Sequence, residues 1–187
     1  AARRIGVIGA GKVGGRLIGH LIDEGAVVYV VDPSAAALTA ITTNYPQVQV
    51  MESTDQLLAI DLDVLSPNAM GGFVTMELAQ TLSTPLICGG ANNQLATPAV
   101  ADVLAARGVL YTPDFLVNCG GVIQVAEELN GCDLERARAR TMQVFATTQQ
   151  VLARAQQEGS TPVAAAESLA EDKIATGAFS EPGQQVV

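Results

Sequence analysis

Short apolar runs alternate with segments of helical periodicity through the first two thirds of the chain. The runs lie at residues 5–8, 26–31, 48–51, 63–66, 85–88 and 109–111. Strands that are apolar on both faces and that alternate with helices are typical of a parallel sheet covered on both sides. The pattern therefore predicts an α/β fold with a doubly wound, six-stranded parallel sheet.

Beyond Gly121 the pattern becomes helical only. The predicted helices lie at 122–129, 134–157 and 162–176, and a polar tail, expected to be loose, lies at 180–187. Because the regular alternation of strand and helix stops here, the chain divides into an α/β domain at residues 1–130 and a C-terminal helical segment at 131–187.

The turn between the first strand and the first helix carries glycines at G-x-G-x-x-G spacing. It reads Gly9-Ala10-Gly11-Lys12-Val13-Gly14. Gly9 makes the turn, Gly11 lets a pyrophosphate approach the backbone, and Gly14 lets the helix lie close to the strand. The amides and the dipole at the start of the helix then face the anion. This unit predicts a Rossmann-type dinucleotide-binding domain.

Asp32 ends the second predicted strand, where a dinucleotide-binding fold places a carboxylate. Such a carboxylate accepts hydrogen bonds from the adenosine ribose hydroxyls and repels a 2′-phosphate. Residues 33–35 include no arginine that would bind this phosphate, so the expected cofactor is NAD rather than NADP. The alternative role for Asp32 is a turn residue or a cap of the next helix.

Three further loops, rich in asparagine and glycine, follow predicted strands. They lie at 67–72, 89–94 and 118–121. Because the carboxyl ends of parallel strands meet at one edge of the sheet, these loops are expected to cluster beside the glycine turn. Their amides suit a neutral polar group such as the carboxamide of nicotinamide. The alternative is that these asparagines only cap helices or shape turns.

Composition excludes several classes of function. The net charge of −9 and the isoelectric point near 4.4 argue against binding to nucleic acid or to an anionic membrane surface. No apolar run approaches the ~20 residues that span a bilayer, and no leader precedes the first strand, so we expect a cytoplasmic protein. Cys88, Cys119 and Cys132 lack C-x-x-C spacing and His20 is the single histidine, so we expect free thiols, a surface histidine and no metal site.

Several segments, in this order and spacing, resemble the cofactor domain of the glutamate, leucine, phenylalanine and valine dehydrogenase family. They are residues 9–14, 32, 67–72, 90–94, 107–114 and 118–123. The resemblance implies NAD-dependent oxidative deamination of an aliphatic or aromatic L-amino acid to a 2-oxo acid and ammonium. It implies that Ala91 and Asn92 lie against the nicotinamide ribose. It also implies that Asn118 lies between nicotinamide and substrate, where it hydrogen-bonds the substrate carboxylate.

The motif and the resemblance together define the expected contacts with the cofactor. They are Gly9, Ala10, Gly11, Lys12, Val13, Gly14, Asp32, Asn68, Ala69, Met70, Ala91, Asn92 and Asn118. Two positions depart from the pattern of the family that the chain resembles. Asn68 stands where a cysteine is usual, and Cys119 stands where an alanine is usual, so both changes concern the contact with nicotinamide.

Acid-base residues for deamination are scarce in this sequence. The reaction needs a base that activates water and a cation for the substrate carboxylate, and lysine suits these roles. The two lysines are Lys12 in the glycine turn and Lys173 among acidic residues, and both are expected to be solvated. In the family, two lysines and an aspartate on an N-terminal substrate domain do this work. We therefore expect no catalytic residue here, NAD binding without turnover, and a substrate domain outside this chain.

Three interpretations of function follow from the sequence. The first is the cofactor-binding part of an amino acid dehydrogenase, which acts on an L-amino acid and a 2-oxo acid and forms a homo-oligomer at full length. The second is a stand-alone NAD-binding sensor or assembly module without catalysis. The third is a different Rossmann dehydrogenase whose catalytic residues lie in this chain. It is the weakest of the three, because no His-Asp or Tyr-Lys pair is evident at suitable positions.

The packing of the C-terminal helical segment has two alternatives. It packs on the α/β domain or on the absent substrate domain. Met142, Val144 and Phe145 could face the side chain of the substrate, but helical spacing explains them equally as core residues, and the core is the interpretation that we favour.

Overall fold

The chain folds around one parallel sheet. The computed structural model describes residues 2–129, 131 and 133–177, and within them six strands pair in the order β3-β2-β1-β4-β5-β6. They are β1 (Arg4–Ile8), β2 (Val27–Val31), β3 (Gln49–Val50), β4 (Val64–Pro67), β5 (Leu86–Ile87) and β6 (Leu110–Tyr111). Because β1 lies between β2 and β4, the strand order reverses there and creates a switch point at the carboxyl edge. The predicted Rossmann-type α/β fold is confirmed.

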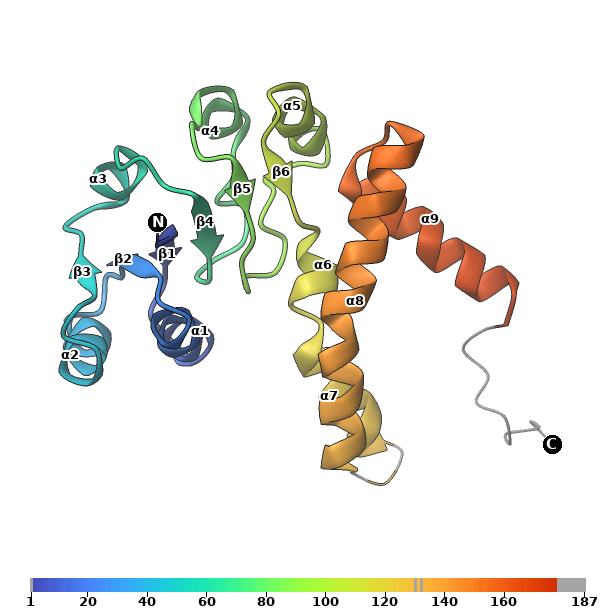
Figure 1. Cartoon of the computed structure of the whole chain (residues 1–187), viewed down its shortest axis with the longest axis horizontal. Coiled ribbons are helices and arrows are strands. Elements are labelled where there is room, and N and C mark those ends of the chain that lie inside the picture. The colour runs from blue at the N-terminus through green and yellow to red at the C-terminus, as the bar shows by residue number, and fades with distance from the viewer. Residues whose placement is uncertain (1, 130, 132, 178–187) are drawn as a thin grey trace.

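Helices cover both faces of this sheet (Figure 1). On one face lie α1 (Lys12–Asp23) and α2 (Ala35–Asn44), and on the other lie α3 (Thr54–Leu58), α4 (Met76–Thr81) and α5 (Val100–Ala106). Past β6 stand α6 (Asp114–Val117), α7 (Gly120–Leu129), α8 (Leu134–Glu158) and α9 (Pro162–Ala175). None of the described helices is both long and apolar enough to cross a bilayer.

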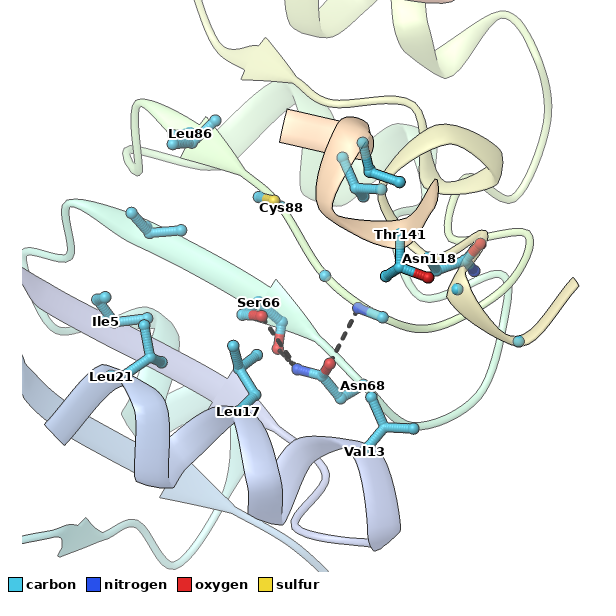
Figure 2. Close-up of a pocket in the computed structure, with 17 residues that line it drawn as sticks. Ile5, Val13, Leu17, Leu21, Ser66, Asn68, Leu86, Cys88, Asn118 and Thr141 are labelled. Atoms are coloured by element: carbon cyan, nitrogen blue, oxygen red, sulfur yellow. Dashed lines mark hydrogen bonds between the residues drawn. The ribbon is translucent and has the colours of Figure 1, made fainter. Parts of the chain in front are cut away.

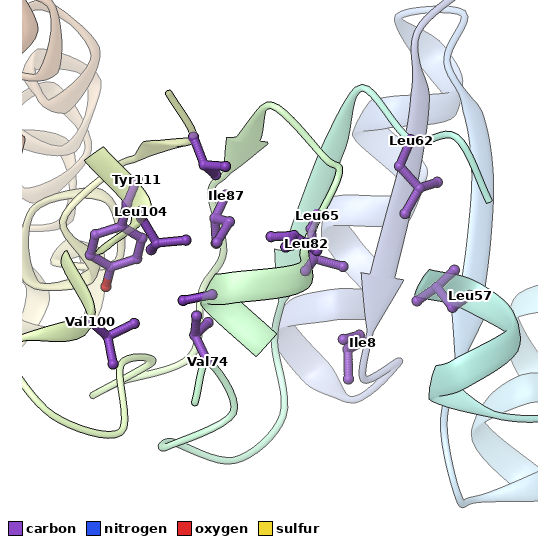
Figure 3. Close-up of a cluster of buried hydrophobic side chains, with 12 residues drawn as sticks. Ile8, Leu57, Leu62, Leu65, Val74, Leu82, Ile87, Val100, Leu104 and Tyr111 are labelled. Atoms are coloured by element: carbon purple, nitrogen blue, oxygen red, sulfur yellow. The ribbon is translucent and has the colours of Figure 1, made fainter. Parts of the chain in front are cut away.

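Alternation along β1 divides the core into two layers. Ile5 and Val7 point toward α1 and α2, where they join a buried cluster that includes Ile18. Ile8 points to the opposite face and joins a larger cluster between the sheet and α3 to α5 (Figure 3). Leu65 of β4 belongs to this second cluster and is fully buried. Apolar side chains on both faces of β1 thus explain its place in the middle of the sheet.

The fourth helix is shorter than the sequence predicts. The pattern predicts a helix over 73–82, whereas α4 begins at Met76. Val74 instead forms a parallel bridge with Leu95, and the Thr75 hydroxyl caps α4. Phe73 and Val74 therefore precede the helix, and both pack in the main hydrophobic core.

A short helix occupies a segment that the sequence analysis treats as a loop. α6 covers residues 114–117, and α7 begins at Gly120 rather than at residue 122. Pro113 presets its own backbone for a helix start, and Asp114 lies in the first turn, where a carboxylate is favourable. Asn118 therefore stands at the end of α6 and does not follow β6 directly.

The helices after β6 form a small core of their own. Val151 and Ala155 of α8 pack against Ala165 and Ala166 of α9, and Leu116 of α6 joins them. Val163 of α9 packs against the main core. The division of the chain at residue 130 stays a prediction. The predicted tail at 180–187 and Cys132 lie outside the described residues.

Glu127 joins α7 to α8 through ion pairs. Its carboxylate is buried and accepts hydrogen bonds from Arg140 at 2.5 Å and from Arg136. The hydrogen bond from Arg140, together with that from Arg136, lowers the pKa of the Glu127 carboxyl despite its burial. The charged form is therefore the one that stabilises the pair of helices.

Replacing Glu127 by glutamine is expected to destabilise the chain at neutral pH. Because the folded-state pKa of Glu127 is lowered, its stabilising effect is present above the unfolded-state pKa and is lost as pH falls through the folded-state value. Urea unfolding should show a lower midpoint for Glu127→Gln than for the unsubstituted chain at about pH 7, and a smaller difference at about pH 4. Exposed Glu128 provides the control: Glu128→Gln should change little. Equal midpoints for the two variants would contradict this role.

Candidate functional site

The glycine turn between β1 and α1 requires two of its glycines for steric reasons. Gly9 has a φ of +98°, a conformation that favours glycine. A Cβ on Gly14 would overlap the carbonyl oxygen of Gly9, so α1 lies this close to the turn only with glycine at that position. The roles predicted for Gly9 and Gly14 thus have a visible structural basis.

The N-terminus of α1 is available to an anion. Ser34, Ser53 and Thr75 cap α2, α3 and α4 with their side chains, whereas α1 follows Gly11 without a side-chain cap. The first amide groups of a helix have no partner within it, so those of α1 are left to water or a ligand. Lys12 at the first position of α1 is exposed and adds a positive charge.

Asp32 links the end of β2 to the glycine turn. Its Oδ2 accepts a hydrogen bond from Ala10 N at 2.7 Å, and its Oδ1 accepts one from Ser34 N at 2.7 Å. Each carboxylate oxygen has capacity for a further hydrogen bond. Asp32 therefore shapes the turn before α2 and still presents acceptor capacity at this edge of the sheet.

The three amide-rich loops meet, as the sequence predicts. Asn68 Oδ1 accepts a hydrogen bond from Gly90 N at 2.9 Å. Asn118 Nδ2 donates to the carbonyl of Ala91 at 3.3 Å and to Asn92 Oδ1 at 2.5 Å. These bonds confirm that the loops share one edge of the sheet. They also show that Asn68 and Asn118 hydrogen-bond within the protein.

A cavity of about 730 Å³ opens beside these loops, between α1, the sheet and α8 (Figure 2). Asn68 and Asn118 lie at its polar end, and Ile5 and Leu86 lie at its apolar end. Its volume suits an organic ligand the size of half a dinucleotide. Val13, a predicted cofactor contact, projects from α1 into the same region.

Several lining residues were not among the predicted contacts. They include Ser66, Cys88, Gly90 and Thr141. Ser66 belongs to β4 and Cys88 follows β5. The alternation of side chains along a strand could have indicated that both face this side of the sheet. Thr141 comes from α8, whose position beside the sheet no sequence pattern indicates.

Ala69 and Met70 do not line this cavity. Met70 is 83% exposed, and Ala69 is exposed beside Gly9 of the glycine turn, so their contact with the cofactor stays a prediction. The prediction that Met142 and Phe145 belong to the core is wrong, because they are 73% and 72% exposed. α8 turns other positions toward its neighbours, and Val144 alone of the three lines the cavity. His20 is exposed, as predicted.

The buried side chain of Gln94 stabilises the loop at 89–94 through hydrogen bonds to its backbone. It is fully buried, and its Nε2 donates to the carbonyls of Gly89 at 2.7 Å and Ala91 at 3.0 Å. Its backbone N–H donates to Asp114 Oδ2 at 3.0 Å, which ties the loop to α6. The role of Gln94 could not be predicted from the sequence, because a glutamine in a polar loop gives no sign of being buried.

Two titratable groups near the loops, the Tyr111 hydroxyl and the Cys119 thiol, are protonated at neutral pH. Burial, and then the charge of Asp114, raise the pKa of the Tyr111 hydroxyl. Burial raises the pKa of the Cys119 thiol. Cys88 and Cys119 carry free thiols, and the described residues contain no group of three or more side chains placed to hold a metal ion.

A sequence model described as Glutamate/Leucine/Phenylalanine/Valine dehydrogenase matches residues 34–180. The chain belongs to this dehydrogenase family. The family is the one that the glycine turn and the amide-rich loops resemble.

Members of the dehydrogenase family named for different amino acids are similar to this chain. A valine dehydrogenase of Streptomyces albus is 44% identical over 174 residues, which cover 92% of this chain and 48% of that protein. A phenylalanine dehydrogenase of Bacillus thermotolerans is 36% identical over 170 residues, 89% of this chain and 44% of that protein. The crystal structure of L-tryptophan dehydrogenase from Nostoc punctiforme superposes with a TM-score of 0.88 at 31% identity, covering 93% of this chain and 52% of that chain. The chain thus spans about half the length of the curated relatives that it matches.

Proposed function

We propose that this chain is the NAD-binding part of an L-amino acid dehydrogenase. The observation that carries the proposal is the uncapped N-terminus of α1, which faces the same edge of the sheet as Asp32 and the amide-rich loops. Family membership and the similarity to valine and phenylalanine dehydrogenases support the reaction class. Bound NAD would supply the hydride acceptor for oxidation of an amino acid to a 2-oxo acid and ammonium.

The residues at this edge fit the parts of a dinucleotide. The first turn of α1 and Gly11 suit a pyrophosphate, because the space that a Cβ of residue 11 would fill is open and can take the anion. Asp32 has acceptor capacity for ribose hydroxyls. The cavity beyond Val13 suits the flat nicotinamide ring, and the loop carbonyls and amides at its polar end suit the carboxamide.

We propose that Asn118 lies at the junction of nicotinamide and substrate. The Ala91 carbonyl only accepts hydrogen bonds, so the Asn118 amide turns its Nδ2 toward it and leaves its Oδ1 as an acceptor. A substrate carboxylate bound by Asn118 would replace Asn92 as the second acceptor of that amide group.

The described lining of the cavity includes no charged side chain that could serve in acid-base catalysis. Among its described lining residues there is no lysine, histidine, aspartate or glutamate. Lys12 lies in the exposed glycine turn and Lys173 lies on α9. We therefore propose that the base and the cation for the carboxylate come from a substrate domain outside this chain. Oligomerisation of the full-length protein and a cytoplasmic location also stay proposals.

The alternative proposal is a stand-alone NAD-binding module. The specific observation in its favour is the same absence of acid-base groups from the described lining of the cavity. The two proposals share the NAD site and differ in whether a substrate domain accompanies it.

Titration calorimetry of the 187-residue chain with NAD and NADP tests the shared part. We expect saturable NAD binding, weaker NADP binding, and about tenfold weaker NAD binding in Asp32→Ala, because it removes charge-assisted hydrogen bonds. Asp55→Ala, at an exposed carboxylate on α3, is the matched control and should bind NAD normally. Deamination assays with leucine, valine and phenylalanine should show no turnover.

Two results would contradict these expectations. Failure of the unsubstituted chain to bind NAD would refute the cofactor site. Turnover by the chain alone would refute the proposal that the acid-base groups lie elsewhere.

A further inference from the structure

The Asn68 side chain connects β4 to the loop after β5 at the polar end of the cavity (Figure 2). Its Nδ2 donates to the backbone carbonyl of Ser66 at 2.9 Å and to Ser66 Oγ at 3.0 Å. Its Oδ1 accepts from Gly90 N at 2.9 Å. Its backbone N–H donates to the Ile8 carbonyl at 2.7 Å. Asn68 thus joins β1, β4 and the loop after β5.

The orientation of this amide follows from its partners. A backbone N–H only donates and a backbone carbonyl only accepts, so Oδ1 must face Gly90 and Nδ2 must face Ser66. Both N–H groups of the Asn68 amide are then used within the protein. Asn68 has no side-chain donor left for a ligand.

Gly90 is held closely at this point. A Cβ on Gly90 would lie 2.8 Å from Asn68 Oδ1 and 2.9 Å from Val13 Cγ1, so the loop backbone packs directly against both side chains. The Ala91 N–H donates to the Pro67 carbonyl at 3.0 Å. The hydrogen bonds made by Asn68 and Pro67 fix two successive peptide groups of the loop.

We propose that Asn68 is a positioning residue for the nicotinamide half of the cofactor. It acts through Gly90, by fixing the backbone that leads into Ala91 and Asn92, and it donates no hydrogen bond to the cofactor. This inference rests on the proposed NAD site.

The distinguishing experiment compares two nucleotides on the 187-residue chain by calorimetry. ADP probes the pyrophosphate and adenosine side, at the glycine turn and Asp32, whereas NAD also engages the nicotinamide side. Asn68→Ala should weaken NAD binding about tenfold and leave ADP binding within about twofold. Asn68→Asp keeps an acceptor for the Gly90 N–H but loses the donor to the Ser66 carbonyl, so it should recover only part of the NAD affinity. Gln80→Ala, which removes an exposed side-chain amide on α4, is the matched control and should change neither affinity.

Each outcome decides the inference. A selective loss of NAD affinity in Asn68→Ala, with partial recovery in Asn68→Asp, supports it. Equal NAD binding by Asn68→Ala and the unsubstituted chain overturns it while leaving the proposed function in place. If Asn68→Ala loses both nucleotides, Asn68→Asp decides: normal ADP affinity with reduced NAD affinity supports the inference, and parallel losses overturn it. If the unsubstituted chain binds neither nucleotide, the proposed function falls, and the inference with it.

Discussion

Replacing Gly14 by alanine is expected to destabilise the chain by about 3 kcal/mol and to abolish measurable NAD binding. The new Cβ would overlap the Gly9 carbonyl oxygen and lie 3.3 Å from the Cβ of Asn68. α1 would have to move away from the turn, which displaces the amides proposed to bind the pyrophosphate. Urea unfolding measures the first effect and calorimetry with NAD measures the second.

Gly11→Ala is the matched comparison, because it adds the same methyl group three residues earlier. A Cβ on Gly11 meets nothing within 4 Å, so its stability should stay close to that of the unsubstituted chain. Its NAD binding should nevertheless weaken, since the methyl group occupies the space proposed for the pyrophosphate. Equal unfolding midpoints for the two variants would show that the helix and the turn are less closely packed than the structure indicates.

Replacing Gln94 by glutamate is expected to cost about 4 kcal/mol of stability at neutral pH. The carboxylate would replace an amide group that donates to the carbonyls of Gly89 and Ala91, so a buried charge would face two acceptors. Protonation relieves this repulsion, which should raise the pKa of the introduced carboxyl. With a raised folded-state pKa, stability is greatest at low pH and falls as pH rises through that value.

Urea unfolding at about pH 5 and about pH 8 tests this expectation. Gln94→Glu should lose stability between the two, relative to the unsubstituted chain. Gln80→Glu, on the exposed side of α4, makes the same chemical change in water and should show little difference. A pH-independent effect equal to that of Gln80→Glu would mean that the Gln94 amide does not support the loop.

The fold could be predicted from the sequence, because continuous apolar runs indicate strands that are buried on both faces of a sheet. Val28 and Val30 are fully buried inside the sheet, and Gly9 and Gly14 occupy positions that tolerate little else. These signals are local, since each depends on the residue and its immediate neighbours. The clustering of the loops then followed from the parallel topology alone.

Partners distant in the sequence were not accessible in this way. Asn68 was predicted to contact the cofactor, yet its amide binds Ser66 and Gly90. Met142 and Phe145 follow helical spacing, but the packing of α8 leaves them in solvent. The partners of these side chains depend on tertiary packing between distant segments, and sequence periodicity does not predict that packing. The cofactor contacts of Asp32 and Asn118 stay predictions.

The central place of β1 has a consequence for how this chain folds. Pairing of β1 with β2 closes a short loop, whereas pairing of Ile5 with Val64 of β4 closes a much longer one. Loop closure costs more entropy as the loop lengthens, and non-local pairing slows folding. The β1 to β3 half should therefore assemble before the second half joins it. Since Asn68 and Gly90 belong to that second half, the cavity comes into existence only at the final step.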